Sequence, residues 1–121
     1  MNAMAISNEN VTIRSIKRAR LYKAPVSSGV EMLSEDIASV LHTECSYFTL
    51  SCSFSVSARL AIVRKVGSDE TIEYLNSGGN LPVNALSLFT FPVDSSERIN
   101  IRFYGNGSCL SLILTEHGGI Y

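Results

Sequence analysis

The 121-residue chain lacks tryptophan and is poor in charge. Charged residues make up 17 % of it, below the roughly 25 % of an average soluble domain. Serine fills many positions at which a charged residue would normally face water. Two interpretations remain open: a polar, uncharged surface that meets solvent, or a surface that meets other protein, because the cores of interfaces are depleted of charge.

Disulfide frameworks, leader segments and membrane spans are missing as well. The three cysteines, Cys45, Cys52 and Cys109, cannot all pair with one another, and their spacing fits no short secreted framework. No signal-peptide pattern opens the chain, and its apolar runs are too short to cross a bilayer. We therefore expect folding in a reducing cytoplasm and no membrane partner, with Cys52 as an inert buried thiol.

Catalytic and metal-binding motifs are absent from the sequence. The side chains that could act as soft metal ligands are His42, Cys45, Cys52, Cys109 and His117. They include no Cys-x-x-Cys pair, and His42-x-x-Cys45 alone is a weak zinc signal. Cys45 near His42 and Glu44 is the one local cluster that resembles an activated nucleophile, without a nucleophile-elbow motif. We interpret these residues as loop positions.

Two other candidates for chemistry also have structural interpretations. Glu70 and Glu73 flank a predicted hairpin, where like charges usually mark a solvated edge and not the paired carboxylates of a glycosidase. Ser77-Gly78-Gly79 lacks the lysine and the following helix of a phosphate-binding loop, so a hinge is the better interpretation. We expect no catalytic residues, no cofactor and no metal.

What the sequence does contain is a clear strand pattern. From Tyr47 to Ser57, apolar residues occupy every even position and Tyr47, Thr49 and a series of serines occupy the odd ones. Because successive side chains of a strand point to opposite faces, this stretch predicts one apolar face and one face covered with hydroxyl groups. Such a strand belongs to a sheet that is packed on one side only.

Turn signals recur about every ten residues and predict seven to eight short strands. Three hairpins are expected, with loops at residues 57–59, 67–69 and 106–107; the last is an Asn-Gly pair, which favours a type I′ turn. In the strand at 85–93 the apolar parity switches between Leu88 and Phe89, which indicates a bulge. Pro92 places the end of that strand at a sheet edge. The pattern predicts an all-β fold, an antiparallel, jelly-roll-like β-sandwich.

In the predicted 57–59 and 67–69 hairpins, Val56 pairs with Leu60 and Arg64 with Ile72. In the 106–107 hairpin, Phe103 pairs with Leu110. Residues 26–116 form the sandwich domain, between a basic N-terminal arm at 1–25 and a C-terminal tail at 117–121. The arm contains a strand from about 16 to 24, with a short helix as the alternative. Ser34 to Ile37 could cap a helical turn.

Charge is distributed unevenly along the chain. Residues 1–25 carry a net charge of +4, and the rest of the chain carries −5. The basic residues of this arm are Arg14, Lys17, Arg18, Arg20 and Lys23. Three interpretations remain open: a solvated strand, docking onto the acidic body of a neighbouring copy, or contact with nucleic acid, which the scarcity of nearby aromatic residues disfavours.

About half of the chain, residues 58–116, resembles small β-sandwich structural proteins of tailed phages and related viruses. The resemblance is carried by the segments 59–64, 73–76 with its Gly-Gly loop, 91–94 and 99–102, by the Gly-Ser-Asp turn at residue 67, and by the Leu-rich closing strand. The basic segment 11–25 lies outside it. The resemblance implies a virion building block, such as a capsid, decoration or tail-associated subunit, with no catalytic residues.

The first functional hypothesis is therefore a non-enzymatic structural subunit of a virion, assembled in the host cytoplasm as symmetric copies. Its partners would be copies of itself and other virion proteins, with the arm reaching a neighbour. The alternative is a ligand- or carbohydrate-binding module such as a receptor-binding tip, for which Tyr47, Tyr74 and Tyr104 are the candidate aromatic residues. A small enzyme is the third and weakest hypothesis.

Overall fold

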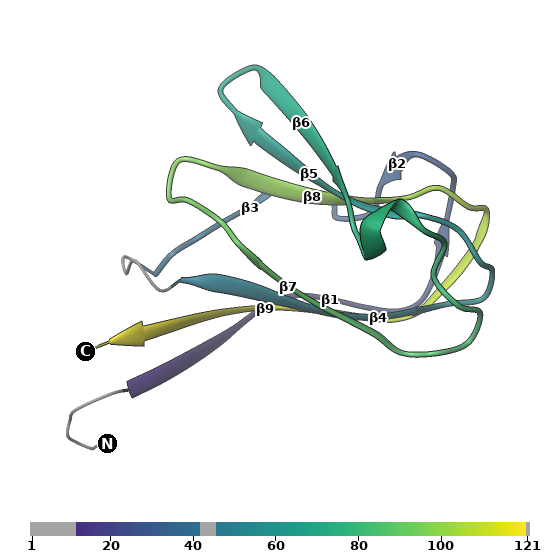
Figure 1. Cartoon of the computed structure of the whole chain (residues 1–121), viewed down its shortest axis with the longest axis horizontal. Helices are drawn as coiled ribbons and strands as arrows, with labels where there is room; N and C mark the ends of the chain where they lie inside the picture. Colours follow the sequence, from purple (N-terminus) through teal and green to yellow (C-terminus); the bar gives the residue numbers. More distant parts are fainter. Residues whose placement is uncertain (1–11, 42–45, 121) are drawn as a thin grey trace.

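The computed structural model of the chain describes residues 12–41 and 46–120. Within them, nine strands form two antiparallel sheets that pack face to face (Figure 1). Sheet A has the order β1-β9-β4-β7, and sheet B has the order β2-β8-β5-β6, with β3 also paired to β8. The elements are β1 (Thr12–Val26), β2 (Val30–Glu31), β3 (Ile37–Ala38), β4 (Tyr47–Phe54), β5 (Leu60–Val66), β6 (Asp69–Tyr74), the 3-10 turn η1 (Asn76–Gly78), β7 (Ser87–Pro92), β8 (Arg98–Phe103) and β9 (Gly107–Ile120).

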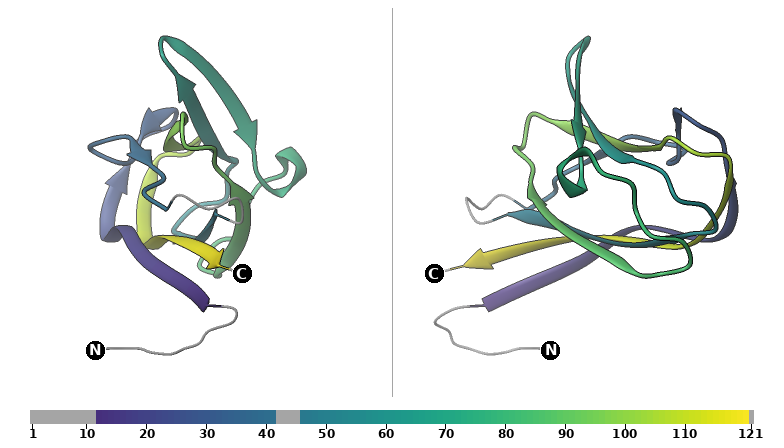
Figure 2. Two further views of the ribbon diagram at one scale, coloured as in Figure 1. Left: turned by 90° about the vertical axis from the view of Figure 1, so that its left-hand side faces the viewer. Right: turned by 45° about the vertical axis from the view of Figure 1, so that its right-hand side comes forward.

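The topology is that of a jelly roll. β2 and β3 both pair with β8 and act as two halves of one interrupted strand. Counted in this way, eight strands alternate between the sheets, except at β5 and β6, which form a hairpin within sheet B. This hairpin projects beyond the body of the sandwich (Figure 2). The predicted all-β, jelly-roll-like sandwich is confirmed.

The alternation in β4 builds the centre of the core. Its even positions, from Phe48 to Phe54, are fully or almost fully buried, whereas its odd positions are partly exposed. The ring of Phe54 stacks on that of Phe103 from the opposite sheet, with 3.8 Å between ring centroids. Cys52 lies among these side chains, so the prediction of a buried thiol is confirmed.

Two of the three predicted hairpins are wrong. The loop after β4 leads to β5 in the opposite sheet, and the Asn106-Gly107 turn leads from β8 in sheet B to β9 in sheet A. Leu60 pairs with Phe103, and Leu110 is only partly buried because a register shift in β9 turns Cys109 inward instead. Both turns are corners between sheets, and alternation alone does not distinguish a corner from a hairpin.

Crowding at these corners explains their sequence. A Cβ atom on Gly105 would lie 2.8 Å from Cβ of Ala58 and 2.9 Å from the ring of Phe103. A Cβ atom on Gly107 would lie 2.8 Å from Oγ of Ser55. The two corner loops therefore pack directly on each other, and only glycine fits at these positions.

The remaining hairpin exists with a different register. Gly67 and Ser68 form a two-residue loop that closes on Val66 and Asp69, so Ile72 pairs with Val63 and not with Arg64. The predicted bulge in β7 is also wrong, because its register with β4 runs without a shift from Ser87 to Pro92. β7 is an edge strand, as Pro92 indicated.

Asn100 explains why the strand before β4 is broken in two. Its side chain, which is 1 % exposed, accepts a hydrogen bond from the backbone N–H of Leu33 and donates one to the carbonyl of Leu33. It also donates to Asp36 Oδ1 at 2.9 Å. The Asn100 amide thus replaces the missing strand partner between β2 and β3, and the expected helical turn at 34–37 is instead a looped-out bend.

The outermost segments are longer strands than expected. β1 covers the predicted strand at 16–24 and extends to Thr12 and Val26, with a register shift between Lys17 and Ala19. β9 continues to Ile120, so residues 117–120 belong to sheet A and not to a tail. Residues 1–11, the first part of the predicted arm, lie outside the described residues.

Candidate interaction surfaces

The outer surface of sheet A is a broad face with many hydroxyl groups. The register aligns the odd positions of β4 with those of β9, the even positions of β7 and the outward residues of β1. We call this surface the hydroxyl face; its members are Arg20, Tyr22, Tyr47, Thr49, Ser51, Ser53, Leu88, Thr90, Pro92, Ser111, Ile113, Thr115 and His117. None of these side chains is a carboxylate.

Large apolar side chains stand at both edges of the hydroxyl face. Leu88 on β7 is 70 % exposed, and Leu86, just before β7, is 61 % exposed. Tyr22 on β1, at the opposite edge, is 72 % exposed. A face with few charges and exposed apolar residues has the composition of the centre of a protein interface.

His117 is held in place on the hydroxyl face. Its ring stacks on that of Tyr47, with 5.1 Å between centroids, and its Nε2 shares a hydrogen bond of 2.8 Å with the hydroxyl of Thr49. Tyr47 was a candidate aromatic for ligand binding, and this stack turns part of its ring surface toward the imidazole.

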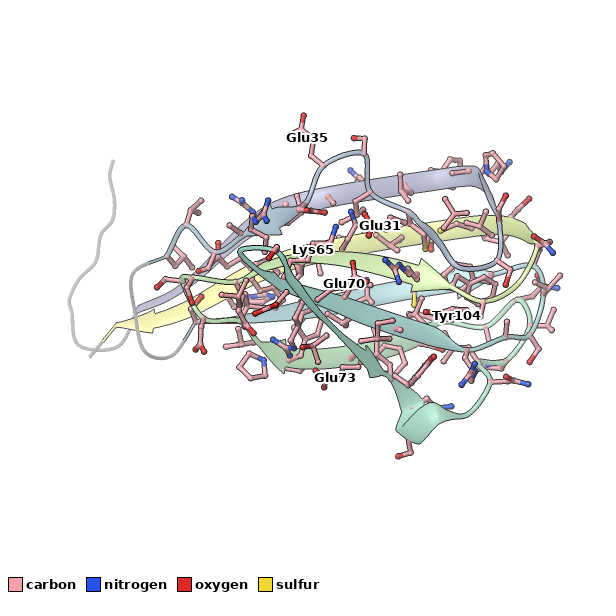
Figure 3. The ribbon with its side chains drawn as sticks, turned by 90° about the horizontal axis from the view of Figure 1, so that it is seen from above. Glu31, Glu35, Lys65, Glu70, Glu73 and Tyr104 are labelled. Carbon is pink, nitrogen blue, oxygen red and sulfur yellow. The ribbon has the colours of Figure 1, made fainter. Side chains whose placement is uncertain are left out.

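The outer surface of sheet B is charged instead. Five carboxylates share four cations within salt-bridge distance; we call these residues the charged network: Glu31, Asp36, Arg64, Lys65, Glu70, Glu73, Glu97, Arg98 and Arg102. Lys65 contacts Glu31 at 3.0 Å, and the two residues lie near each other in Figure 3. Lys65 also contacts Asp36 at 3.2 Å. Most of these cations thus serve two carboxylates each.

The network shifts the acidities of its members. The hydrogen bond from Lys65 is the main cause that lowers the pKa of Glu31. For Asp36, the hydrogen bond from Asn100 is the largest cause of the lowered pKa. Burial acts to raise this pKa, and the hydrogen bond from Lys65 lowers it further. Glu70 and Glu73, the carboxylates that flank the hairpin, contact Arg102 and Arg64, respectively. They act here as partners of arginines at a solvated edge, in line with the structural interpretation of their spacing.

β6 is the most exposed strand of the described chain. All six of its residues are exposed, because the hairpin extends past the edge of sheet A. Among the described strands β6 pairs only with β5, so within this part of the chain its other edge carries unpaired backbone groups. Among the described side chains, Asp69 at the start of β6 has no salt-bridge partner.

An aromatic cluster lies where β6 meets the loop after β8. The guanidinium carbon of Arg59 is 4.3 Å from the ring centroid of Tyr74 and 5.5 Å from that of Tyr104. The two tyrosine rings are 5.7 Å apart and tilted by 47°. Two of the three candidate ligand-binding tyrosines are therefore together, joined by a cation that the sequence did not single out.

The predicted subunit-interaction residues all belong to β1. Arg20 and Lys23 are exposed, and Nη2 of Arg18 donates to the carbonyl of Ala38 at 2.8 Å. Arg14 and Lys17 belong to the same strand, and the structure describes their backbone but not their side chains. The structure thus places these five residues along one sheet edge.

The candidate metal and nucleophile residues do not form a site in the described part of the chain. His42 and Cys45 lie outside the described residues. Cys52 and Cys109 are buried free thiols; burial raises the pKa of Cys52 to about 12 and that of Cys109 to about 11. Among residues 12–41 and 46–120, no three His, Cys, Asp or Glu side chains group as metal ligands would. The Ser77-Gly78-Gly79 segment overlaps η1 (Asn76–Gly78), in which Ser77 has a positive φ of 53°.

A buried carboxylate was missed. Glu116 is fully buried and accepts hydrogen bonds from the hydroxyls of Ser39 and Ser46 and from the backbone N–H groups of Val40 and Leu41. Burial alone would raise the pKa of Glu116, but these four donors hold it below its ordinary value. Its signal in the sequence is its parity: Glu116 continues the inward positions of Leu112 and Leu114.

Comparison with known proteins gives one fold relative. No family model matches the chain, and no curated protein matches it. A solved structure with the description "Bacillus endospore appendages form a novel family of disulfide-linked pili" superposes with a TM-score of 0.51 and 13 % identity over the whole of both chains. At this identity the likeness shows a shared fold. No helix in the described residues is long and apolar enough to cross a membrane.

Proposed function

We propose that this protein is a non-enzymatic structural subunit that assembles with copies of itself. The hydroxyl face is the observation that carries this proposal. It places few charges and no carboxylate over four strands, and the exposed Leu86, Leu88 and Tyr22 stand at its edges. Burying such a surface removes few ions from water and gains apolar contact.

The fold relative supports self-assembly, because its description names pili, which are filaments built from many protein subunits. Within this class we propose a virion component, a capsid, decoration or tail-associated subunit, since jelly rolls are common in capsids and residues 58–116 resemble phage sandwich proteins. Assembly would occur in the host cytoplasm. A gene position among capsid and tail genes would support the virion, and a position among appendage genes would favour a filament.

In this proposal, the two cysteines among the described residues, Cys52 and Cys109, form no disulfide bonds between copies. Cys52 and Cys109 are fully buried and face the core, so neither reaches another chain without opening the sandwich. The disulfide linkage named for the Bacillus pili therefore does not extend to these two thiols.

Light scattering after size exclusion, over a concentration series, tests the assembly, with negative-stain microscopy of the same samples. We expect oligomers whose size grows with concentration, and smaller species when Leu86→Arg is combined with Leu88→Arg, because these substitutions put charge at the hydroxyl face. Val30→Arg is the matched control, since Val30 is 56 % exposed on β2, away from the hydroxyl face. A wild-type protein that stays monomeric at the highest concentration reached would refute the proposal.

The cluster of Arg59, Tyr74 and Tyr104 favours a second candidate function, the binding of a carbohydrate. Tyrosine faces stack on sugar rings, and an arginine beside them can donate hydrogen bonds to hydroxyl groups. A glycan array probed with wild type and with Tyr74→Ala decides this: binding that the variant loses supports it, and an array without hits excludes it.

A further inference from the structure

The two sides of the sandwich end in different edge strands. On one side, β1 lies beside β2 and β3, as the bond from Arg18 to Ala38 shows. On the other side, β6 is the edge of sheet B and β7 is the edge of sheet A, and Nη1 of Arg64, on the neighbouring β5, donates to the carbonyl of Pro92 on β7 at 2.7 Å. A contact between β1 of one copy and β6 of another would therefore join opposite sides of the molecule.

β1 carries cations without carboxylate partners. Among the described side chains, Arg18, Arg20 and Lys23 take part in no salt bridge. Within residues 12–41 and 46–120, β1 forms its ladder with β9 only, and an open groove of about 290 Å³ separates its residues 18–21 from the connection between β2 and β3. Glu35 is the carboxylate that lines this groove. The edge of β1 is thus accessible and positively charged.

β6 carries the opposite charge. Its residues Asp69, Glu70 and Glu73 are all exposed, and they belong to a surface on which carboxylates outnumber cations. Even the two that contact arginines share those arginines with Glu31 or Glu97. The outer edge of β6 is therefore accessible and negatively charged.

The backbone of β6 is also free to pair. In the two-residue hairpin, Val66 and Asp69 form the closing pair, and Leu75 N donates to Leu60 O at 2.9 Å at the other end. Because hydrogen-bonded and non-bonded pairs alternate in an antiparallel ladder, the N–H groups of Glu70, Ile72 and Tyr74 point away from β5. These groups could extend sheet B by one more strand.

We propose that the β6 edge of one copy binds the β1 edge of the next, so that sheet B of one subunit continues into sheet A of its neighbour. This inference rests on the proposed self-assembly and adds a second contact, at the sheet edges, to the one at the hydroxyl face. The contact uses two different surfaces, so it is heterologous, and it repeats into a ring or an open filament. Opposite charges on the two edges favour this pairing and disfavour β1 with β1 or β6 with β6.

Complementary charge reversals test the contact. Variant X carries Asp69→Lys and Thr71→Lys, two exposed positions on β6 whose side chains contact no cation. Variant Y carries Arg20→Glu and Lys23→Glu on β1. In variant X the two new lysines balance Glu70 and Glu73, so β6 loses its net negative charge. In variant Y two new glutamates replace two of the exposed cations of β1. Each variant alone therefore lacks the charge complementarity of the two edges and is expected to lose the head-to-tail oligomers seen with wild type in sedimentation velocity at low salt. An equimolar mixture of X and Y, or all four substitutions in one chain, places the new lysines opposite the new glutamates and is expected to restore the oligomers.

Two further variants complete the test. Asp94→Lys with Ser96→Lys makes the same change in charge on the exposed turn after β7 and is expected to leave assembly unchanged. Ile72→Pro removes an outward N–H without removing a bond to β5 and is expected to weaken assembly. Oligomers of unchanged size in both X and Y would overturn this contact while leaving self-assembly intact, and so would a loss that the mixture does not rescue. A monomeric wild type would instead overturn the proposed function itself.

Discussion

Replacing Glu116 by glutamine tests whether a buried carboxylate holds one end of the sandwich together. The carboxylate accepts four hydrogen bonds, from Ser39, Val40, Leu41 and Ser46, and so fastens the segment after β3 to β9. Glutamine keeps the shape but offers one acceptor oxygen in place of two, and its amide group then faces at least one donor.

The expected loss follows from these contacts. One buried donor left without an acceptor costs about 1–3 kcal/mol, and each remaining bond weakens by roughly 0.5–1 kcal/mol when its acceptor is no longer charged. Removing a buried charge offsets part of this. We therefore expect the free energy of unfolding of Glu116→Gln to fall by about 2–4 kcal/mol near neutral pH, which corresponds to a melting temperature lower by about 8–15 °C.

The pH dependence gives a sharper test. Because the folded pKa of Glu116 lies below the ordinary value of 4.5, the unfolded chain takes up the proton first as the pH falls. The stabilisation is complete above the unfolded pKa and is lost as the pH falls through the folded pKa. The difference between wild type and Glu116→Gln should therefore be largest near about pH 7 and shrink toward about pH 3.

Urea unfolding followed by circular dichroism at several pH values measures this difference; without tryptophan, fluorescence would be a weaker probe. Glu35→Gln is the matched control, because Glu35 is exposed and takes part in no salt bridge of the described residues. A difference for Glu116→Gln that stays constant or grows on acidification would refute the role assigned to the carboxylate.

Three other predictions concern the core and its corners. Asn100→Ala leaves the N–H and C=O of Leu33 without partners and should lower the free energy of unfolding by about 2–4 kcal/mol in urea titrations. Gly105→Ala places a methyl group 2.8 Å from Ala58 and should lower it by about 1–3 kcal/mol, measured as a reduced melting temperature. Cys52 and Cys109 should resist a thiol reagent in the folded protein and react fully in denaturant, since burial shields them and raises their pKa values to about 12 and about 11.

The alternation of residues predicted which side chains enter the core, but not which strands pair. Phe48, Leu50 and Phe103 are buried as expected, because a period of two fixes the face of each side chain. The partner of a strand depends on contacts distant in sequence. The Asn106-Gly107 turn has the local chemistry of a hairpin, yet it connects the two sheets, since β9 finds both its neighbours, β1 and β4, far away in the chain.

The candidate surfaces were predicted in part. The hydroxyl face followed from the odd positions of β4, and the basic residues of β1 from composition. The exposure of β6 was not foreseeable: Ile72 and Tyr74 alternate with polar residues as in a half-buried strand, and only the projection of the hairpin beyond sheet A leaves every position exposed. Asn100 likewise has no signal, because it is an outward position of β8 that the bend at 33–36 happens to cover.

The two outer surfaces of the sandwich suit different contacts because their ions differ. On sheet B, Lys65 already has two carboxylate partners. Burying such an ion in an interface would cost desolvation free energy and add few new ionic contacts to offset that cost. On sheet A, burying hydroxyl groups and Leu88 removes few charges. A face of this kind can hold copies together without fixing a head-to-tail orientation between them. Direction requires two edges that differ, and the cations of β1 and the carboxylates of β6 supply that difference at opposite sides of the same fold.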